Sequence, residues 1–194
     1  MAESAPTLFV VDDDASVRNA LQRLLRSRGY RVETFADAAA YVARPPFEGL
    51  GCLILDLRMP GMSGIELQAQ LDGSERALPV VFLSGHGDLP SGVEAMKRGA
   101  VDFLQKPVDE EALVHSVELA LDRRRTALAA HAVQASARGR LESLTPRELE
   151  VVRCVLSGAR NKQIADRMQS GFVPAGRQVG DQAAALGITT LCDQ

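Results

Sequence analysis

Acidic side chains, one serine and one lysine follow four short apolar segments of the sequence. Asp12 and Asp13 follow the first segment, Asp56 the third, Ser84 the fourth and Lys106 the fifth. If these segments are parallel strands, their carboxyl ends meet at one edge of a sheet and bring the polar side chains together. Carboxylates this close repel one another by about 4 kcal/mol for a pair about 4 Å apart at an effective dielectric constant of about 20, so a cation is expected. Mg²⁺ fits because it prefers hard oxygen ligands and leaves positions open for water and a phosphate, and Lys106 adds a second positive charge.

The apolar pattern predicts the sheet that this arrangement needs. Short apolar segments with little in-out polarity alternate with stretches whose apolar residues recur at helical spacing, which is typical of a parallel sheet covered on both faces. We therefore predict an α/β domain of about 120 residues with a doubly wound five-stranded parallel sheet. The predicted strands are 7–11, 31–35, 50–55, 80–83 and 101–104, and the predicted helices cover 17–25, 37–43, 65–71, 93–98 and a long segment from 109.

Composition excludes several classes of protein. Of 194 residues, 46% are hydrophobic and 24% are charged, too apolar for a disordered chain. No apolar run reaches the roughly 18 residues of a membrane-spanning helix, and the N-terminus lacks the pattern of a signal peptide, so we expect a cytoplasmic protein without membrane contact. The three cysteines are far apart, which argues against a disulfide framework or structural zinc.

Charge divides the chain into two unequal parts. Residues 1–122 contain 11 basic and 19 acidic side chains, whereas residues 123–194 contain 11 basic and 6 acidic ones. The basic C-terminal part is consistent with a polyanionic partner such as nucleic acid, and a solvated surface explains the excess nearly as well.

The C-terminal part is predicted to begin with a helical linker. Residues 123–141 are rich in Ala, Arg and Gln, with a weak apolar face. We expect the arginines at 123–125 to lie on a solvated helix face, and contact with DNA is the alternative for them. A new helix is predicted at Thr145, because this residue can cap it, Pro146 suits the first helical position and Glu148 completes a capping box.

A partial helix-turn-helix is predicted for residues 142–168. Gly158 ends its first helix and residues 161–168 form a second short helix. From about residue 169, glycines and a proline oppose a continuous helix, so we expect residues 169–194 to lack stable structure.

Residues 6 to about 122 resemble the receiver domain of bacterial two-component response regulators over its whole length. The resemblance rests on motifs at 10–14, 55–64, 84–88 and 99–107. The resemblance implies a flavodoxin-like fold for the receiver domain at 1–122. The sequence looks most like the branch of the family in which a LuxR/FixJ-type DNA-binding domain follows the receiver. Residues 144–168 resemble the first half of that domain, and the recognition helix that should follow is missing.

The resemblance implies specific roles for the clustered residues. Asp56 would accept a phosphoryl group from a phosphohistidine of a sensor histidine kinase. Asp13 and Asp56 would hold Mg²⁺, with Arg58 contributing its backbone carbonyl and Asp12 acting through a water molecule. Lys106 would stabilise the transferring phosphoryl group.

The resemblance also implies a switch and partners. Ser84 would move to hydrogen-bond the phosphoryl group and Phe103 would turn inward behind it. The Lys106–Pro107 bond would be cis, and phosphorylated molecules would form a homodimer through the fourth helix, fifth strand and fifth helix. The protein would catalyse only its own phosphoryl transfer and slow autodephosphorylation. Lys162 could contact DNA phosphate, without sequence specificity.

We therefore expect a response regulator that is phosphorylated on Asp56 to control DNA binding and transcription. One alternative keeps the receiver as a phosphate sink or partner-binding module with a non-functional DNA-binding half. A remote alternative is a magnesium phosphatase of the haloacid-dehalogenase type, since residues 12–16 can be read as DxDxS. That chemistry places its nucleophile on the first strand and needs a late acidic pair, which this sequence does not supply well.

Overall fold

The structure, a computed structural model, describes residues 5–74, 77–85 and 89–145, together with residues 148, 149, 152, 155 and 156. By its internal contacts the chain divides into two compact units, residues 1–129 and 130–194. The predicted second helix of the helix-turn-helix, Lys162 and residues 169–194 lie outside the described residues. The domain boundaries at 122, 141 and 168 stay predictions.

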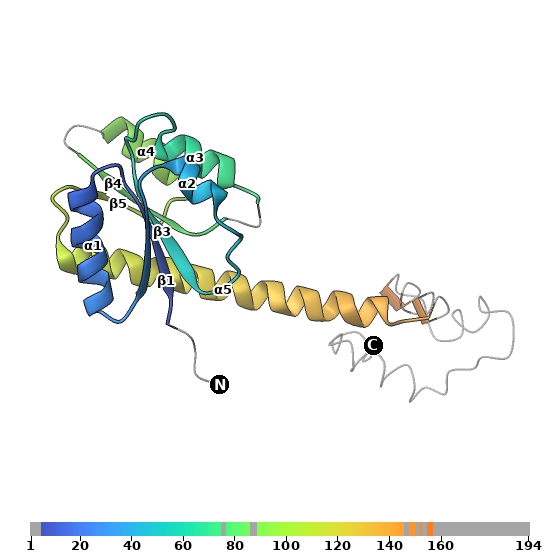
Figure 1. The fold of residues 1–194 in the computed structure, drawn as a ribbon. Helices are drawn as coiled ribbons and strands as arrows, with labels where there is room; N and C mark the ends of the chain where they lie inside the picture. Colours follow the sequence, from blue (N-terminus) through green and yellow to red (C-terminus); the bar gives the residue numbers. More distant parts are fainter. Residues whose placement is uncertain are drawn as a thin grey trace, which may run out of the picture. The chain divides into compact units, whose positions relative to one another are not determined.

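A five-stranded parallel sheet forms the centre of the first unit (Figure 1). Its strands are β1 (Thr7–Val11), β2 (Arg31–Phe35), β3 (Gly51–Asp56), β4 (Val80–Ser84) and β5 (Asp102–Gln105), in the spatial order β2-β1-β3-β4-β5. All four neighbouring pairs are parallel. The chain first moves outward from β1 to β2 and then returns past β1 to β3. In such sheets this reversal opens a crevice at the carboxyl ends of the two strands, where ligands bind.

Helices cover both faces of the sheet. They are α1 (Ala15–Ser27), α2 (Ala38–Ala43), α3 (Gly64–Leu71), α4 (Leu89–Lys97) and α5 (Glu110–Glu142). Figure 1 shows α1 and α5 on one face and α2, α3 and α4 on the other. This is the doubly wound arrangement that the alternating pattern predicts, so the predicted α/β fold is confirmed.

The sheet separates two hydrophobic clusters. Every residue of β1, β3 and β4 is buried, because these inner strands are covered on both faces. Among the buried members of the cluster under α2, α3 and α4 are Phe9, Val11, Leu53, Leu55, Phe82, Tyr41, Leu67 and Ala95. Among those under α1 and α5 are Leu8, Val10, Cys52, Ile54, Val81, Leu21, Leu25, Leu113 and Val117.

Element boundaries differ from the prediction where backbone pairing continues past the apolar run. Asp56 is the last residue of β3 and still pairs with Leu83 of β4, so the carboxylate is mounted on the strand itself. Helix α4 begins at Leu89, four residues before the predicted start. Pro90 is the second residue of this helix. Because proline has a low helix propensity, the sequence did not indicate this start, although proline is tolerated in the first turn of a helix.

The longest helix contains the predicted linker. Helix α5 has 33 residues and runs without interruption through 123–141, so the linker continues the last helix of the sheet domain. Beyond it, the predicted capping box is present: the Thr145 N–H donates to Glu148 Oε2 over 2.8 Å, and the Glu148 N–H donates to Thr145 Oγ1 over 3.3 Å. Within the described part of the chain, no helix has the length and apolar character needed to cross a membrane.

Candidate functional site

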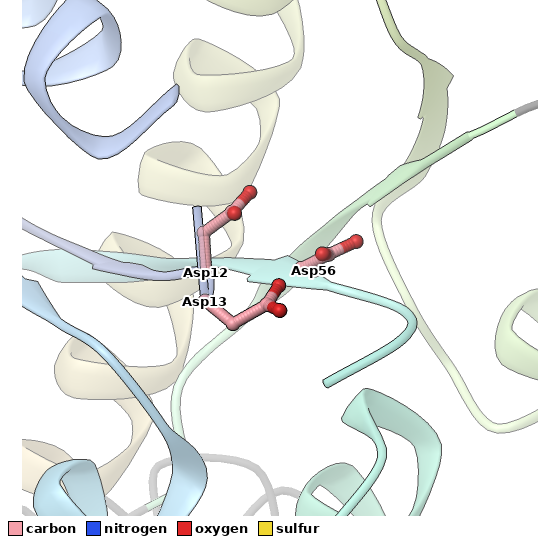
Figure 2. Close-up of side chains that lie close together, drawn as sticks. All are labelled: Asp12, Asp13 and Asp56. Carbon is pink, nitrogen blue, oxygen red and sulfur yellow. The ribbon is translucent and has the colours of Figure 1, made fainter. Parts of the chain in front are cut away.

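Three carboxylates meet where β1 and β3 end (Figure 2). Val11 pairs with Leu55, so Asp12 and Asp56 follow at the same level of the sheet. One oxygen from each of Asp12, Asp13 and Asp56 lies within 4.8 Å of the others. Asp12 is fully buried, Asp56 is 6% exposed and Asp13 faces solvent. The arrangement is therefore an acidic pocket that is open on the Asp13 side.

Lys106 supplies the positive charge of this pocket. Its Nζ lies 2.6 Å from Asp12 Oδ2 and 3.1 Å from Asp56 Oδ2. The Lys106 backbone N–H donates to the Ser84 carbonyl over 2.7 Å, which fixes the chain after β5 beside the end of β4. The Lys106–Pro107 peptide bond is cis. The structure thus brings together the aspartates and the lysine that the sequence pattern singles out.

Burial and charge shift two pKa values in the pocket. Burial raises the pKa of Asp56 and the Asp12 charge adds to this, while Lys106 and the Arg58 backbone N–H act in the opposite direction. Burial on its own would lower the pKa of Lys106, but its bonds to Asp12 and Asp56 outweigh this and leave that pKa raised. An ammonium ion is therefore held next to a carboxylate that is reluctant to ionise.

The sign of each pKa shift fixes its effect on stability. Both groups have folded-state pKa values above their unfolded-state values, so protonation of either one favours the folded chain. As the pH rises through the raised pKa of Asp56, ionisation of that carboxyl weakens the fold in the absence of a metal. The contribution of Lys106 is lost only in alkali, as the pH rises through its own raised pKa.

We expect Lys106→Met to raise the pKa of Asp56 further, because the substitution removes the bond and charge that lower it. The measurement is a pH titration of the Asp56 carboxyl carbon by NMR, without Mg²⁺. Lys97→Met, at the end of α4, is the matched control and should leave the titration unchanged. A pKa in Lys106→Met equal to or below that of the unmodified protein would contradict the assignment.

The predicted switch residues lie on neighbouring strands. Ser84 ends β4, is 1% exposed and donates its hydroxyl to the Gly85 carbonyl over 3.0 Å. Phe103, on β5, is half-buried and packs on the hydrophobic cluster under α2, α3 and α4. Its ring lies against Gly92 of α4, where a Cβ atom would come within 3.2 Å of it. The Phe103 ring is thus positioned to respond to any movement of α4.

Asp14, which follows Asp12 and Asp13 in the sequence, has a different role. Asp14 caps α1, and its carboxylate accepts from the Ser16 N–H over 2.7 Å and from the Ser16 hydroxyl over 2.6 Å. These bonds lower the pKa of Asp14. Its own N–H donates to Asp12 Oδ1 over 2.9 Å, so the cap also orients the buried carboxylate.

For two residues that support the pocket, the sequence analysis predicted no role. Arg18 Nη1 donates to the Asp12 carbonyl over 2.6 Å from the first turns of α1. At Gly64, the first residue of α3, a Cβ atom would lie 2.3 Å from the Asp56 carbonyl oxygen, so only glycine allows the helix to begin this close to β3. Gly64 belongs to the 55–64 motif, which was the only signal for it, whereas nothing local distinguishes Arg18 from other helix arginines.

The pocket fits a small divalent cation. Its donors are hard carboxylate oxygens, two of them on buried or nearly buried residues, and the exposed Asp13 leaves one side accessible. The Arg58 side chain is exposed, and its backbone N–H bonds the Asp56 carboxylate. Gly61, with φ of +83°, turns the loop that carries this backbone past Asp56.

Comparisons with known proteins agree with this geometry. Residues 8–118 match the family model of the response regulator receiver domain, and residues 142–169 match that of bacterial regulatory proteins of the luxR family. The chain is 41% identical over 158 residues to the transcriptional regulatory protein FixJ of Bradyrhizobium diazoefficiens, covering 81% of this chain and 77% of that protein. It is also 41% identical over 165 residues to the response regulator protein TodT of Pseudomonas putida, covering 85% and 73%.

A solved structure shares the fold. The low-resolution structure of the response regulator StyR superposes with a TM-score of 0.81 at 44% identity, covering 95% of this chain and 93% of that one. The luxR-family match ends at residue 169, where the sequence pattern departs from that family. Because the receiver model spans more than half of the chain, the resemblance stated from the motifs is confirmed. The chain belongs to the bacterial two-component response regulators, with a receiver domain followed by a luxR-family region.

Proposed function

We propose that a sensor histidine kinase phosphorylates this response regulator on Asp56 and thereby controls DNA binding and transcription. The observation that carries the proposal is the position of Asp56 at the end of β3, in a cluster with Asp12 and Asp13 and 3.1 Å from Lys106. A nucleophilic carboxylate, a cation pocket and a fixed ammonium ion are the parts that phosphoryl transfer to a protein carboxylate needs.

The proposed reaction moves one phosphoryl group. A carboxylate oxygen of Asp56 attacks phosphorus while the phosphorus–nitrogen bond of the phosphohistidine breaks, and the bonding electron pair returns to the imidazole nitrogen. Asp13, Asp56 and the Arg58 carbonyl would hold Mg²⁺, with Asp12 acting through a water molecule, and the ion would supply positive charge that neutralises the phosphoryl oxygens. Lys106 already contacts Asp56 and offers its ammonium to the same oxygens. Hydrolysis of the acyl phosphate by water would return the protein slowly to its starting state, and no other substrate is turned over.

The proposed switch uses the two residues next to the pocket. The Ser84 hydroxyl leaves the Gly85 carbonyl, its present acceptor, and donates to the phosphoryl group. Phe103 then turns inward, away from its contact with Gly92 of α4. This changes the surface formed by α4, β5 and α5, through which we propose that two phosphorylated molecules associate.

The surface of α4 and β5 has the features of a contact between copies of the chain. Val93 and Met96 on α4 are 49% and 45% exposed and lie together in one surface patch. A groove of about 580 Å³ is lined by Gly92, Val93, Met96, Lys97, Asp102 and Phe103. Lys97 and Asp102 bring opposite charges to one patch, so two copies related by a two-fold axis can pair them reciprocally.

A second candidate function rests on the end of the luxR-family match at residue 169. If no recognition helix forms, the receiver acts as a phosphate sink or a partner-binding module that does not read DNA.

In the phosphatase alternative the nucleophile would be Asp12, but that side chain is fully buried and bonded to Lys106 and to the Asp14 N–H. Because the chain belongs to the response regulators, we do not propose the phosphatase activity.

We propose that the protein lies in the cytoplasm, where both a sensor kinase and DNA are accessible to it.

DNA binding separates the two remaining functions. With beryllofluoride and Mg²⁺ as a phosphoryl mimic, we expect the full chain to bind labelled duplex from upstream of its neighbouring genes at least about tenfold more tightly than without them, because dimerisation adds a second contact to the same duplex. The measurement is fluorescence anisotropy at several salt concentrations, and Asp56→Asn is the control that should not respond. Equal or absent binding in both states would reject transcriptional control and leave the phosphate sink. Residual binding through Lys162 would be strongly salt-dependent and insensitive to sequence.

A further inference from the structure

Two consecutive arginines of α5 attach this helix to the end of the sheet that lies opposite Asp56. Arg124 donates from Nε to the Gly49 carbonyl over 3.2 Å, from Nη1 to the Ala77 carbonyl over 3.4 Å and from Nη2 to the Phe47 carbonyl over 3.4 Å. Phe47 and Gly49 precede β3 and Ala77 precedes β4, so one guanidinium spans the loops that enter two neighbouring strands.

The neighbouring arginine reaches a third loop. Arg123 Nη1 donates to the Gly99 carbonyl over 3.3 Å. Gly99, with φ of +88°, closes α4: its N–H donates to the Met96 carbonyl and the Ala100 N–H donates to the Ala95 carbonyl. A glycine at this position is a common way to end a helix. The Arg123 side chain donates to the carbonyl of this glycine. The acceptor of Arg123 therefore moves whenever the C-terminal end of α4 moves.

These contacts differ from those of a solvated helix face, which the sequence predicts for residues 123–125. A guanidinium group has five donors in a planar fork, and three backbone carbonyls converge on the fork of Arg124. Each contact is longer than an ideal hydrogen bond, so the attachment depends on their number. Burial lowers the pKa of Arg124, consistent with a side chain drawn out of solvent. Arg125, by contrast, is exposed and pairs with Asp122 on its own helix.

We infer that Arg123 and Arg124 hold the segment where α5 leaves the sheet and couple this segment to the C-terminal end of α4. The coupling rests on the proposed function, since it matters only if phosphorylation moves α4. Arg124 fixes the helix to the loops before β3 and β4, which form the static support. Arg123 ties the same turn of helix to the α4 terminus, which is the moving part. A displacement of α4 then reaches the helix that continues toward the luxR-family region.

Amide hydrogen exchange on the full chain tests the attachment. In Arg124→Gln we expect roughly tenfold faster exchange for residues 122–130, because the variant loses three hydrogen bonds from a charged donor while β1 and β3 stay protected. Arg125→Gln removes the same charge from the same helix and should leave exchange unchanged. Unchanged exchange in Arg124→Gln, or a uniform increase that includes β1 and β3, would overturn the inference. If Arg124→Gln does not fold, Arg123→Gln, with a single exposed contact, is assessed by the same criteria.

Beryllofluoride with Mg²⁺ tests the coupling. In the unmodified protein we expect the mimic to change exchange both near Ser84 and at residues 122–130. The double variant Arg123→Gln and Arg124→Gln should keep the first change and lose the second. Persistence of the second change in the double variant, or its absence in the unmodified protein, would overturn the coupling. Absence of any change near Ser84 in the unmodified protein would instead contradict the proposed phosphorylation site, and the attachment measured without the mimic would stand.

Discussion

Asp56→Asn should reduce phosphorylation by acetyl phosphate and Mg²⁺ to background while the fold is retained. An amide lacks the nucleophilic oxygen anion that attacks phosphorus, and the neighbouring Asp12 is fully buried and already bonded to Lys106, so it does not replace it. The fold should tolerate the change because asparagine has nearly the same shape. The substitution also removes a carboxyl group whose pKa is raised in the folded protein, which means that the folded state disfavours its ionised form.

Incorporation of label and the intact mass after incubation measure the effect. Asp72→Asn, at the exposed end of α3, is the matched control and should be labelled like the unmodified protein. Urea unfolding of both variants checks that the fold is retained. Label that persists on Asp56→Asn would show that another residue accepts the phosphoryl group, and the assignment of the site would be wrong.

Gly64→Ala should destabilise the protein by about 2 to 3 kcal/mol and slow phosphorylation. The added Cβ would lie 2.3 Å from the Asp56 carbonyl oxygen, 3.0 Å from the Phe82 ring and 3.1 Å from Leu55 Cγ. A backbone carbonyl cannot turn aside as a flexible side chain can. Either α3 or the end of β3 must therefore shift, and the Asp56 carboxylate shifts with the strand.

Urea unfolding gives the stability change, and the rate of label incorporation gives the effect on the site. Gly139→Ala is the control, since a Cβ at that helical position meets nothing within 4 Å. It should leave stability unchanged or raise it by up to about 1 kcal/mol, as expected for glycine replacement in a helix. A Gly64→Ala protein with normal stability and rate would mean that the approach of α3 to β3 is not required for the site.

Local patterns were sufficient to predict the sheet and the central residues of its pocket. Strands such as 7–11 are continuous apolar runs, and a parallel sheet places whatever follows them at one edge, so Asp12, Asp56 and Lys106 could be grouped without coordinates. The metal ligands, the roles of Ser84 and Phe103 and the domain boundaries came from the family resemblance or from composition, and they stay predictions.

What the sequence did not predict depends on backbone atoms of other segments of the chain. Arg124 contacts carbonyls 47 to 77 residues away from it, and backbone carbonyls carry no side-chain signature in a sequence. The same holds for Arg18, whose acceptor is a main-chain oxygen. Gly64 is needed because a helix meets a strand at this point, a steric condition that arises only when both elements are placed.

The location of Asp56 on β3 has a mechanical consequence. β3 is the middle strand of the five and, like β1 and β4, is hydrogen-bonded to a strand on each side. β5 has one neighbour, and its residues are only partly covered. We therefore expect the proposed phosphorylation of Asp56 to change the structure at β5 and to leave β3 in place. The proposed reaction and the proposed shape change would then lie on an inner strand and on an edge strand of the same sheet.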